Sequence, residues 1–439
     1  MALSGNKGWS VVWAGTGINL ALGILYAWSI FKGAISESIR QGGQNAFQWD
    51  LATINDPYAV CCLVFAFSMI LAGKCQDRFG PRITATIGGL LVATGFVLVS
   101  FTTNYWLWVL GFGVLVGMGI GFGYSSATPP ALKWFPPAKT GLIAGIVVSG
   151  FGLAAVYAAP LATYFLNSNG LQWTMMFFGI AFAIIVSLLS LLLINPPAGY
   201  VHKAVPNIQK TAPTSIKAQD FTPGEMLKTR SFYVLWLIYC VGAGAGLMVI
   251  GSVAGMAKQS MAELAFLAVV ILAVGNAAGR VVAGSLSDRI GRNVTLTLML
   301  GFQSILMFIA IPVLGAEHPS SLLIVLIATG IGFNYGTNLA LFPALSKDYW
   351  GLKNFGVNYG LLFTAWGVGG FVLGRVSEMM KASTGSYTLS FGLAGTLLAV
   401  ATLAMLLKDL FRQMAHQSKS TTVESTLKAP FHPALERPA

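Results

Sequence analysis

A single arginine, Arg280, lies in the middle of a long apolar segment, in the run Ala-Val-Gly-Asn-Ala-Ala-Gly-Arg-Val-Val-Ala-Gly. A charge at the centre of a membrane-spanning helix costs about 2.5–3.5 kcal/mol on insertion scales, so it should face a wet cavity or a partner. No Asp or Glu is expected at the same depth, because Asp56, Glu263 and Glu378 lie near the ends of apolar segments. A guanidinium binds a carboxylate through two parallel hydrogen bonds. The sequence therefore predicts an anionic substrate as its partner, and an arginine satisfied by backbone carbonyls or by snorkelling is the alternative.

Polar and aromatic residues of other apolar segments are candidates to line the same cavity. Asn276 lies one helical turn before Arg280 on the same face and could hold a hydroxyl or carbonyl group. A tyrosine provides an apolar wall together with a hydroxyl that forms hydrogen bonds. The other candidates for substrate binding are Tyr26, Tyr124, Ser149, Tyr335, Tyr359 and Trp366. For each of these, anchoring at the membrane interface or packing in the core remains an open alternative.

The composition shows that these residues must be positioned by membrane-spanning helices. Of the 439 residues, 55% are hydrophobic and 9% are charged, and the mean hydropathy is +0.73. A soluble domain carries about 25% charged residues. Apolar runs of about 20 residues recur along the chain, and each is long enough to span a hydrocarbon core of about 30 Å as a helix. The runs are continuous and not alternating, which excludes a β-barrel.

Twelve such runs predict an all-α membrane protein with twelve transmembrane helices in two six-helix halves. The expected spans are 9–32, 56–73, 83–101, 106–130, 141–165, 173–194, 232–256, 262–283, 294–314, 321–343, 355–376 and 387–408. We expect residues 1–194 to form the N-terminal half, 195–230 a cytoplasmic linker, 231–410 the C-terminal half and 411–439 a disordered cytoplasmic tail. A short surface helix is expected near 221–229, at the end of the linker.

The net charge of +12 reports the orientation of the chain and not an affinity for nucleic acid. This span assignment puts 20 of the 26 Lys and Arg residues on one side of the membrane, 5 on the other and 1 inside a span. The richer side should be cytoplasmic. Both termini are therefore expected there, in a multi-pass protein of the cytoplasmic (inner) membrane. The first apolar run, from Trp9 to Phe31, is too long for the core of a cleavable signal peptide.

Enzymatic and metal-binding functions are not indicated by the sequence. The four cysteines show no disulfide or metal-ligand spacing and are interpreted as small packing residues: Cys61, Cys62, Cys75 and Cys240. We find no nucleophile–base set, metal cluster or phosphate-binding loop, so neither catalysis nor a cofactor is expected. The expected functional unit is a monomer.

A loop motif occurs twice, at equivalent places in the two halves. Gly73, Asp77, Arg78 and Gly80 after the second span match Gly284, Asp288, Arg289 and Gly291 after the eighth, at a constant offset of 211 residues. Parallel repeats are typical of transporters, and this loop resembles the cytoplasmic signature of the major facilitator superfamily. The resemblance implies that fold and an inner gate formed by Asp77, Arg78, Asp288 and Arg289. We expect Gly80 and Gly291 to permit tight turns, and Gly73 and Gly284 to let a neighbouring helix come close.

Further stretches narrow the resemblance. The run from Gly8 to Val12 resembles the first-span signature of monocarboxylate transporters. The run from Trp134 to Gly152 resembles their fifth-span signature, with one basic residue, Lys139, where that family has two. The run from Asn358 to Gly367 is similar to bacterial relatives of the oxalate/formate antiporters. These resemblances imply a small organic anion as the transported substrate.

The departures from both families predict the charge of that anion. Oxalate antiporters use a lysine of the eleventh span as a second cation, and Trp366 stands at what looks like that position. One cation and an aromatic wall suit one carboxylate, so we expect a monocarboxylate such as lactate or pyruvate. An acid one turn before the arginine in monocarboxylate transporters is replaced here by Asn276.

A proton is expected to travel with the anion. An anion alone works against an inside-negative potential at about 2.3 kcal/mol per 100 mV. Glu378 and Lys32 are the candidate proton-coupling residues, Lys32 because it resembles a lysine in the first span of monocarboxylate transporters. An exchanger of the oxalate/formate type, a facilitator for a neutral solute and a membrane sensor that binds without transport remain alternatives.

Overall fold

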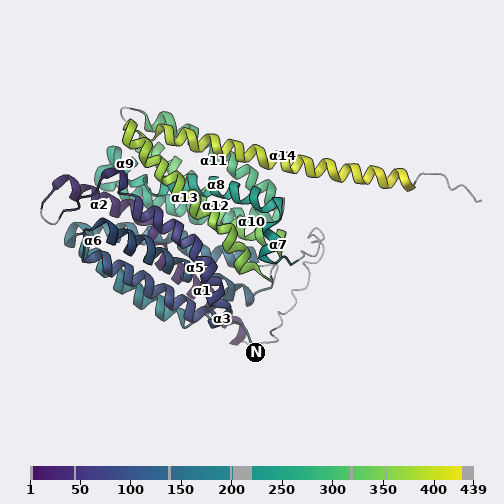
Figure 1. Ribbon diagram of the computed structural model, residues 1–439, viewed down its shortest axis with the longest axis horizontal. Coiled ribbons are helices and arrows are strands. Elements are labelled where there is room, and N and C mark those ends of the chain that lie inside the picture. The colour runs from purple at the N-terminus through teal and green to yellow at the C-terminus, as the bar shows by residue number, and fades with distance from the viewer. Residues whose placement is uncertain are drawn as a thin grey trace, which may run out of the picture.

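The computed structural model describes residues 3–43, 46–136, 140–197, 200, 220–316, 320–351 and 353–427. Most of these residues are helical, and no strand occurs among them. The elements in chain order are α1 (Leu3–Leu22), η1 (Gly23–Ala27), α2 (Trp28–Gln41), η2 (Leu51–Thr53), α3 (Asp56–Ser100), α4 (Tyr105–Trp108), η3 (Val109–Val116), α5 (Gly117–Lys133), α6 (Thr140–Ser190), α7 (Pro223–Leu227), α8 (Arg230–Ile250), α9 (Val253–Met261), η5 (Ala262–Ala265), α10 (Phe266–Ile290), α11 (Arg292–Leu314), α12 (Ser321–Trp350), α13 (Phe355–Thr384) and α14 (Thr388–Leu427). Figure 1 shows the long helices packed side by side in one bundle.

The long helices cross a membrane twelve times in the described part of the chain. Eleven segments are long and apolar enough to span. The longest, Leu142–Ser190, has 49 residues, and as one straight helix it would be about 74 Å long, more than twice the hydrocarbon thickness. Its direction changes at Gly170, where φ is 80°, so it supplies two spans. The predicted count of twelve is therefore confirmed, and so is the all-α fold.

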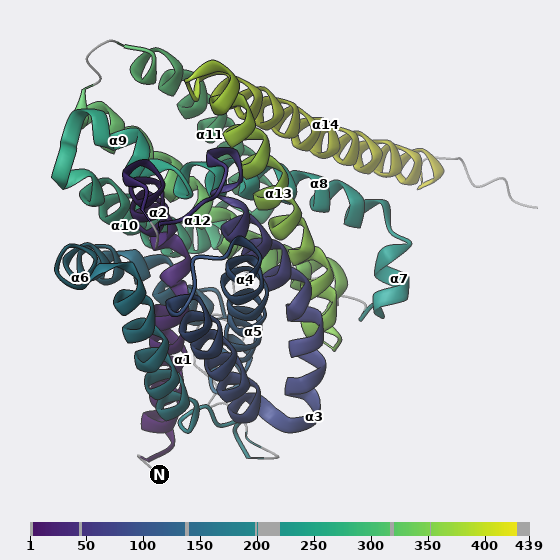
Figure 2. The same ribbon diagram turned by 60° about the vertical axis from the view of Figure 1, so that its left-hand side comes forward.

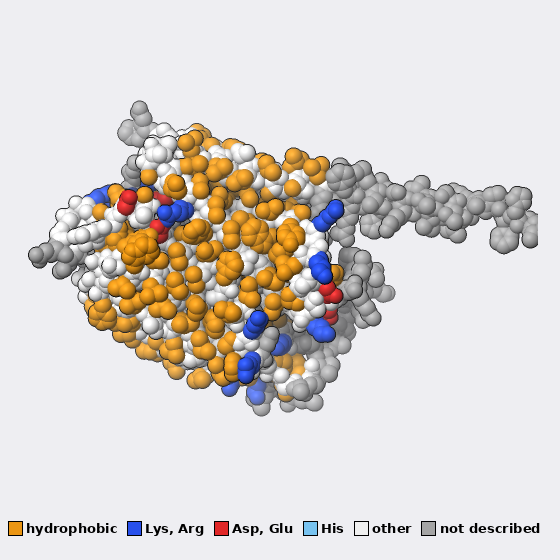
Figure 3. Space-filling view, viewed as in Figure 1, with side chains coloured by type: hydrophobic (Ala, Val, Ile, Leu, Met, Phe, Trp, Pro, Cys, Tyr) orange, Lys and Arg blue, Asp and Glu red, His pale blue; other side chains and the backbone are white. Residues whose placement is uncertain are grey.

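The surface of the bundle has the composition that lipid requires. Large apolar side chains point outward on many helices, among them Leu71, Leu90, Leu188, Phe302, Ile305 and Leu403. In the view of Figure 3, hydrophobic side chains cover the middle of the molecule, and Lys and Arg side chains gather towards the right-hand end. Exposed cations at the end that carries the N-terminus include Lys74, Arg78, Arg82, Lys133, Lys228, Arg230 and Arg289. The cations therefore gather at one end of the bundle, and the cytoplasmic location of that end remains a prediction.

Glycines in the repeated loops give the turns that the sequence predicted. Gly80 has φ 83° and Gly291 has φ 96°, a left-handed conformation that side chains disfavour. Gly80 thus divides α3 into two spans, and Gly291 separates α10 from α11. The other expectation is wrong: a Cβ at Gly284 would meet open space, and one at Gly73 would make only an ordinary contact with Gly356. The close helix approach occurs deeper in the membrane.

Helices α10 and α12 approach each other closely beside Arg280. A Cβ at Gly279 would overlap the carbonyl oxygen of Phe333, and a Cβ at Gly336 would overlap that of Asn276. Small residues allow such backbone contact between transmembrane helices. The two helices therefore hold Arg280, Asn276 and the following turn of α12 in a fixed relation.

Gly279→Ala should destabilise the protein, because the added methyl group has no space between the two backbones. We expect a loss of about 1–3 kcal/mol, typical of overpacking in a well-packed core. Gly284→Ala is the matched control, since it lies five residues further along α10 and meets open space. Thermal unfolding in detergent should show a lower midpoint for Gly279→Ala only; equal midpoints for the two variants would contradict the packing account.

The linker and the C-terminal tail are partly described. The expected surface helix is confirmed as α7, which begins with a capping box between Thr222 and Glu225. Hydrogen bonds from Thr222 to the carboxylate lower the pKa of Glu225. Residues 201–219 of the linker lie outside the described residues.

Helix α14 differs from the expectation of a disordered tail from residue 411. It continues to Leu427, and residues 428–439 lie outside the described part. The segment 408–427 contains no Pro or Gly, so each residue can extend the helix by one more hydrogen bond. Figure 1 shows α14 projecting beyond the bundle at the end where the N-terminus lies.

Two spans are interrupted at corresponding places in the two halves. The first span consists of α1, the 3₁₀ segment η1 and α2, and its close fit against α6 depends on Gly23, which faces the Phe151 carbonyl. The seventh span consists of α8 and α9, separated at Gly251 and Ser252. Figure 2 shows α2 and α9 at the end of the bundle opposite to the N-terminus, where the two helices contact each other.

Candidate functional site

Arg280 lies inside the bundle, and its hydrogen-bond partners among the described residues are all neutral groups. Its side chain is 1% exposed. Nε donates to Oδ1 of Asn276 at 3.1 Å, Nη1 donates to the carbonyl oxygen of Val148, and Nη2 donates to the hydroxyl of Tyr26 at 3.4 Å. Among the described side chains, no carboxylate forms an ion pair with it. The guanidinium is thus held at the interface of α10, α6 and η1, and no described side chain compensates its charge.

A chain of hydrogen bonds extends from Arg280 through two tyrosines to a tryptophan. The hydroxyls of Tyr26 and Tyr335 are 2.6 Å apart. Nε1 of Trp366 donates to the Tyr335 hydroxyl at 2.8 Å. All three side chains are buried, and they come from η1, α12 and α13. The predicted residues Arg280, Asn276, Tyr26, Tyr335 and Trp366 therefore form one connected group.

This group has more hydrogen-bond donors than acceptors. A guanidinium has five N–H donors, and Arg280 uses three of them. The Nδ2 amide of Asn276 is buried without a partner. The two tyrosine hydroxyls share one hydrogen bond, and both already accept from other donors, so one hydroxyl proton has no acceptor among the described residues. Buried donors normally have partners, so the arrangement favours a ligand that is rich in acceptors and negatively charged.

Aromatic rings form the wall beside these donors. Tyr124 packs on Phe65, Phe151 and Phe363, with ring centroids 5.4, 5.4 and 5.9 Å apart. Phe363 stacks on Trp366 at 5.0 Å. The predicted residue Tyr124 therefore lies in an aromatic cluster that is continuous with the hydrogen-bonded group, and this cluster supplies an apolar surface.

Two predicted binding residues do not reach Arg280. Ser149 donates to the carbonyl of Ile146 in its own helix. Tyr359 packs between Phe355 and Phe363, which lie about one turn before and one turn after it on α13. Neither is among the described hydrogen-bond partners of the guanidinium, so their binding roles remain predictions.

The sequence analysis missed several groups that surround the arginine. Phe65, Phe151 and Phe363 gave no polar signal, although Phe151 stands between the small residues Gly150 and Gly152. A Cβ at Gly152 would lie 3.2 Å from Nε of Arg280, so this glycine leaves room for the guanidinium. The Val148 carbonyl is a backbone group, and no side-chain pattern could have identified it.

The two candidate proton-coupling residues form an ion pair at the end of the bundle opposite to the N-terminus. Nζ of Lys32 and Oε1 of Glu378 are 2.6 Å apart, and the side chains are 13% and 8% exposed. A second ion pair, between Arg375 and Asp56, lies beside it and was not predicted. Each pair joins the first six spans to the last six.

The repeated loops lie at the other end, and their ionic contacts are local. Arg292 binds Asp288 at 2.5 Å and Asp348 at 3.5 Å, which ties α10, α11 and α12 together. Arg78 lies over the ring of Phe79 at 5.3 Å, and Arg289 is exposed. The side chain of Asp77 and the residue Lys139 lie outside the described part, so the inner gate remains a prediction.

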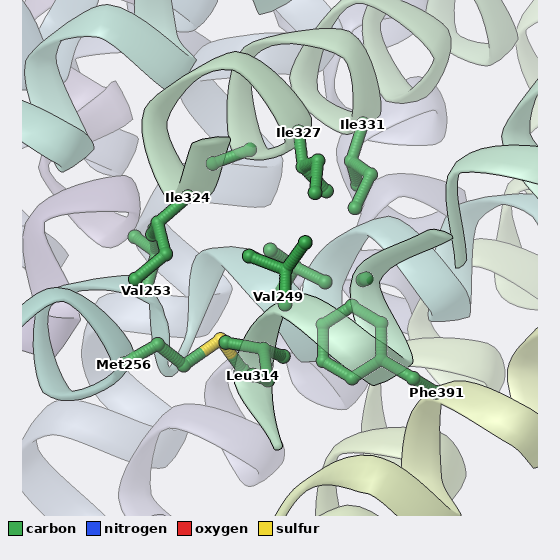
Figure 4. Close-up of a pocket in the computed structure, with 11 residues that line it drawn as sticks. Val249, Val253, Met256, Leu314, Ile324, Ile327, Ile331 and Phe391 are labelled. Carbon is green, nitrogen blue, oxygen red and sulfur yellow. The ribbon is translucent and has the colours of Figure 1, made fainter. Parts of the chain in front are cut away.

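The cavity in Figure 4 is separate from this group of residues. It has a volume of about 20 Å³ and is lined by apolar side chains of α8, α9, α11, α12 and α14, including Val249, Met256 and Phe391. It offers an ionic ligand no polar contact. Among the described residues, no cluster of His, Cys, Asp and Glu has the geometry of a metal site.

Comparison with known proteins finds similarity to membrane transporters. The sequence model of the Major Facilitator Superfamily matches residues 10–374. The uncharacterized MFS-type transporter YhjX of Escherichia coli (strain K12) is 30% identical over 80% of this chain and 82% of its own length. The oxalate:formate antiporter of Oxalobacter formigenes is 28% identical, with 83% and 82% covered. Monocarboxylate transporter 13 of Rattus norvegicus is 24% identical, with 88% and 86% covered.

Proposed function

The chain belongs to the major facilitator superfamily of multi-pass membrane transporters, and from that premise we propose that it carries small monocarboxylates of the lactate or pyruvate class together with a proton. The observation that carries this proposal is the surplus of donors around Arg280, a buried cation with no carboxylate partner among the described side chains. A carboxylate supplies both the missing charge and the missing acceptors.

The anion is proposed to bind with its carboxylate on Arg280. The free Nδ2 of Asn276 and a tyrosine hydroxyl would hold a second oxygen, such as the keto or hydroxyl oxygen of the substrate. The aromatic cluster around Tyr124 would contact its apolar part. One cation is available in this group, and Trp366 supplies an N–H donor and no charge, which favours a monoanion over a dianion.

Transport is proposed to occur by alternating access. The first six and the last six spans rock about the central group and expose Arg280 to each side in turn, with Asp77, Arg78, Asp288 and Arg289 as the proposed inner gate. Val148 and Tyr26 bind Arg280 from the first six spans. These two contacts cross the plane along which the halves would separate, so they must break in each cycle.

An imposed pH gradient should change the initial rate of lactate or pyruvate uptake in proteoliposomes. Acid on the outer side should raise it several-fold, because a proton that enters with the anion moves down its own gradient and so drives uptake. Glu378 and Lys32 are our proposed proton-coupling residues, since a buried carboxylate beside a lysine alters the local charge balance when it takes up a proton. Glu378→Gln should therefore reduce the dependence on pH. Uptake that ignores the gradient would exclude proton coupling.

An anion exchanger of the oxalate/formate type is the second candidate. The similarity to the oxalate:formate antiporter favours it, and an unpaired arginine would serve an exchanger equally well. A counterflow screen with radiolabelled lactate, pyruvate, formate, acetate and oxalate separates the two. Counterflow of oxalate and formate without dependence on pH would establish the exchanger, and a neutral-solute facilitator would show none of these fluxes.

A further inference from the structure

Glu378 accepts hydrogen bonds from three separate parts of the chain. Its Oε1 atom accepts from Nζ of Lys32 at 2.6 Å, from the hydroxyl of Ser252 at 2.8 Å and from the hydroxyl of Tyr387 at 3.2 Å. Lys32 lies on α2, Ser252 lies where α8 and α9 meet, and Tyr387 lies between α13 and α14. One carboxylate therefore links the outer segments of both interrupted spans to α13.

A second ion pair lies one turn away on the same helix. Arg375 of α13 binds Asp56 at the start of α3, and Asp56 also accepts from the hydroxyl of Tyr105 at 2.7 Å. The Arg375 and Asp56 side chains are 40% and 11% exposed, so this pair is the more accessible of the two. Exposed ion pairs contribute less than buried ones, because water and salt screen them.

Both pairs connect the first six spans to the last six at the end opposite to the exposed cations and the N-terminus. If the halves part at this end, Lys32 must leave Glu378 and Arg375 must leave Asp56. Breaking a buried ion pair leaves an uncompensated charge and is strongly unfavourable. The contacts thus oppose opening at this end and do not act at the other.

We propose that the Lys32–Glu378 ion pair, with Ser252 and Tyr387 as further donors, is the lock that keeps the outer entrance closed, and that Arg375–Asp56 is a weaker second contact. This lock rests on the proposed alternating-access function. Glu378 is its centre because it alone among these residues binds both interrupted spans. The helix interruptions at η1 and at Gly251–Ser252 would let α2 and α9 move when the lock opens.

A native cysteine lies where opening can be detected. Cys62 is fully buried six residues, or about 9 Å, along α3 from Asp56. A Cβ at Gly370 of α13 would lie 3.5 Å from its Cβ, so Cys62 lies between the two halves. Its neighbour Cys61 is equally buried but packs against Gly117 of α5, within the first six spans. The two adjacent thiols therefore form a matched probe and control.

The experiment measures the rate at which a charged, membrane-impermeant maleimide labels Cys62 in right-side-out vesicles. The other three cysteines are replaced by serine, and a parallel protein retains only Cys61. Glu378→Gln keeps the shape of the side chain and removes the charge, so labelling of Cys62 should rise by about tenfold or more. Lys32→Met should have the same effect, Lys32→Arg should retain protection, and Arg375→Gln should give a smaller rise.

The double variant Lys32→Met/Glu378→Gln should label no faster than either single variant, because both changes remove one interaction. Cys61 should stay protected throughout; if it became labelled as well, unfolding and not opening would be the cause, and the lock would be rejected. Unchanged labelling of Cys62 in Glu378→Gln, or faster labelling only in inverted vesicles, would also overturn the proposal. The readout needs no substrate, so a failure of the monocarboxylate assignment leaves it interpretable.

Discussion

Arg280→Gln should reduce anion uptake in proteoliposomes by about two orders of magnitude, since truncating one member of a buried, hydrogen-bonded charge pair costs about 2–5 kcal/mol. Glutamine retains a donor for the Tyr26 hydroxyl and the Val148 carbonyl but cannot supply charge to a carboxylate. The measurement is initial uptake of radiolabelled lactate or pyruvate. Because Arg280 has no carboxylate partner among the described side chains, its removal should leave no unpaired anion in the protein, and the variant should fold.

Two further variants separate charge from geometry. Arg280→Lys keeps the charge but loses the planar fork, so we expect partial activity with weaker binding. Arg230→Gln removes one exposed positive charge at the start of α8 and should transport normally. If the Arg280→Gln protein took up lactate at the normal rate, the assignment of an anionic substrate would have to be abandoned.

Trp366→Lys should shift the preference of the transporter from a monoanion to a dianion. The new ammonium would lie near the Tyr335 hydroxyl, two hydrogen bonds from the tyrosine that binds Arg280. A charged hydrogen bond to a second carboxylate is worth about 1.5–3 kcal/mol, so uptake of oxalate relative to lactate should rise by about tenfold or more. Competition between the two labelled anions measures the ratio directly.

Trp366→Phe is the control for this change. It preserves an aromatic ring against Phe363 but removes the N–H donor to Tyr335. We expect lower affinity and the same preference for a monoanion. A Trp366→Lys protein whose selectivity matched that of Trp366→Phe would mean that the number of cations does not determine which anion is carried.

The fold was predictable from sequence because lipid imposes a strict length and polarity on each span. The tight turns after the second and eighth spans were correctly predicted from Gly80 and Gly291. The interruptions of the first and seventh spans, at η1 and at Gly251–Ser252, were not predicted. No proline or charge marks either interruption, and glycine is so frequent in this chain, with 51 residues, that Gly23 and Gly251 did not stand out.

The hydrogen-bonded group around Arg280 was predictable only in part from the sequence. Arg280 and Asn276 are one turn apart, and helical geometry alone brings them together. Tyr26, Tyr335 and Trp366 were found as polar or aromatic residues at membrane depth, but their mutual contacts depend on how three helices pack. Lys32 and Glu378 were each named, yet their pairing across 346 residues required the tertiary structure.

The glycine contacts between α10 and α12 divide the proposed substrate-binding residues into two sets. Arg280, Asn276 and Tyr335 belong to two helices whose backbones touch, so in the proposed transport cycle we expect them to move together. Tyr26 and Val148 bind the guanidinium from the first six spans. A carboxylate that binds as proposed would compete with Tyr26 and Val148 for the same N–H groups, so Arg280 would exchange two acceptors of the protein for those of the substrate.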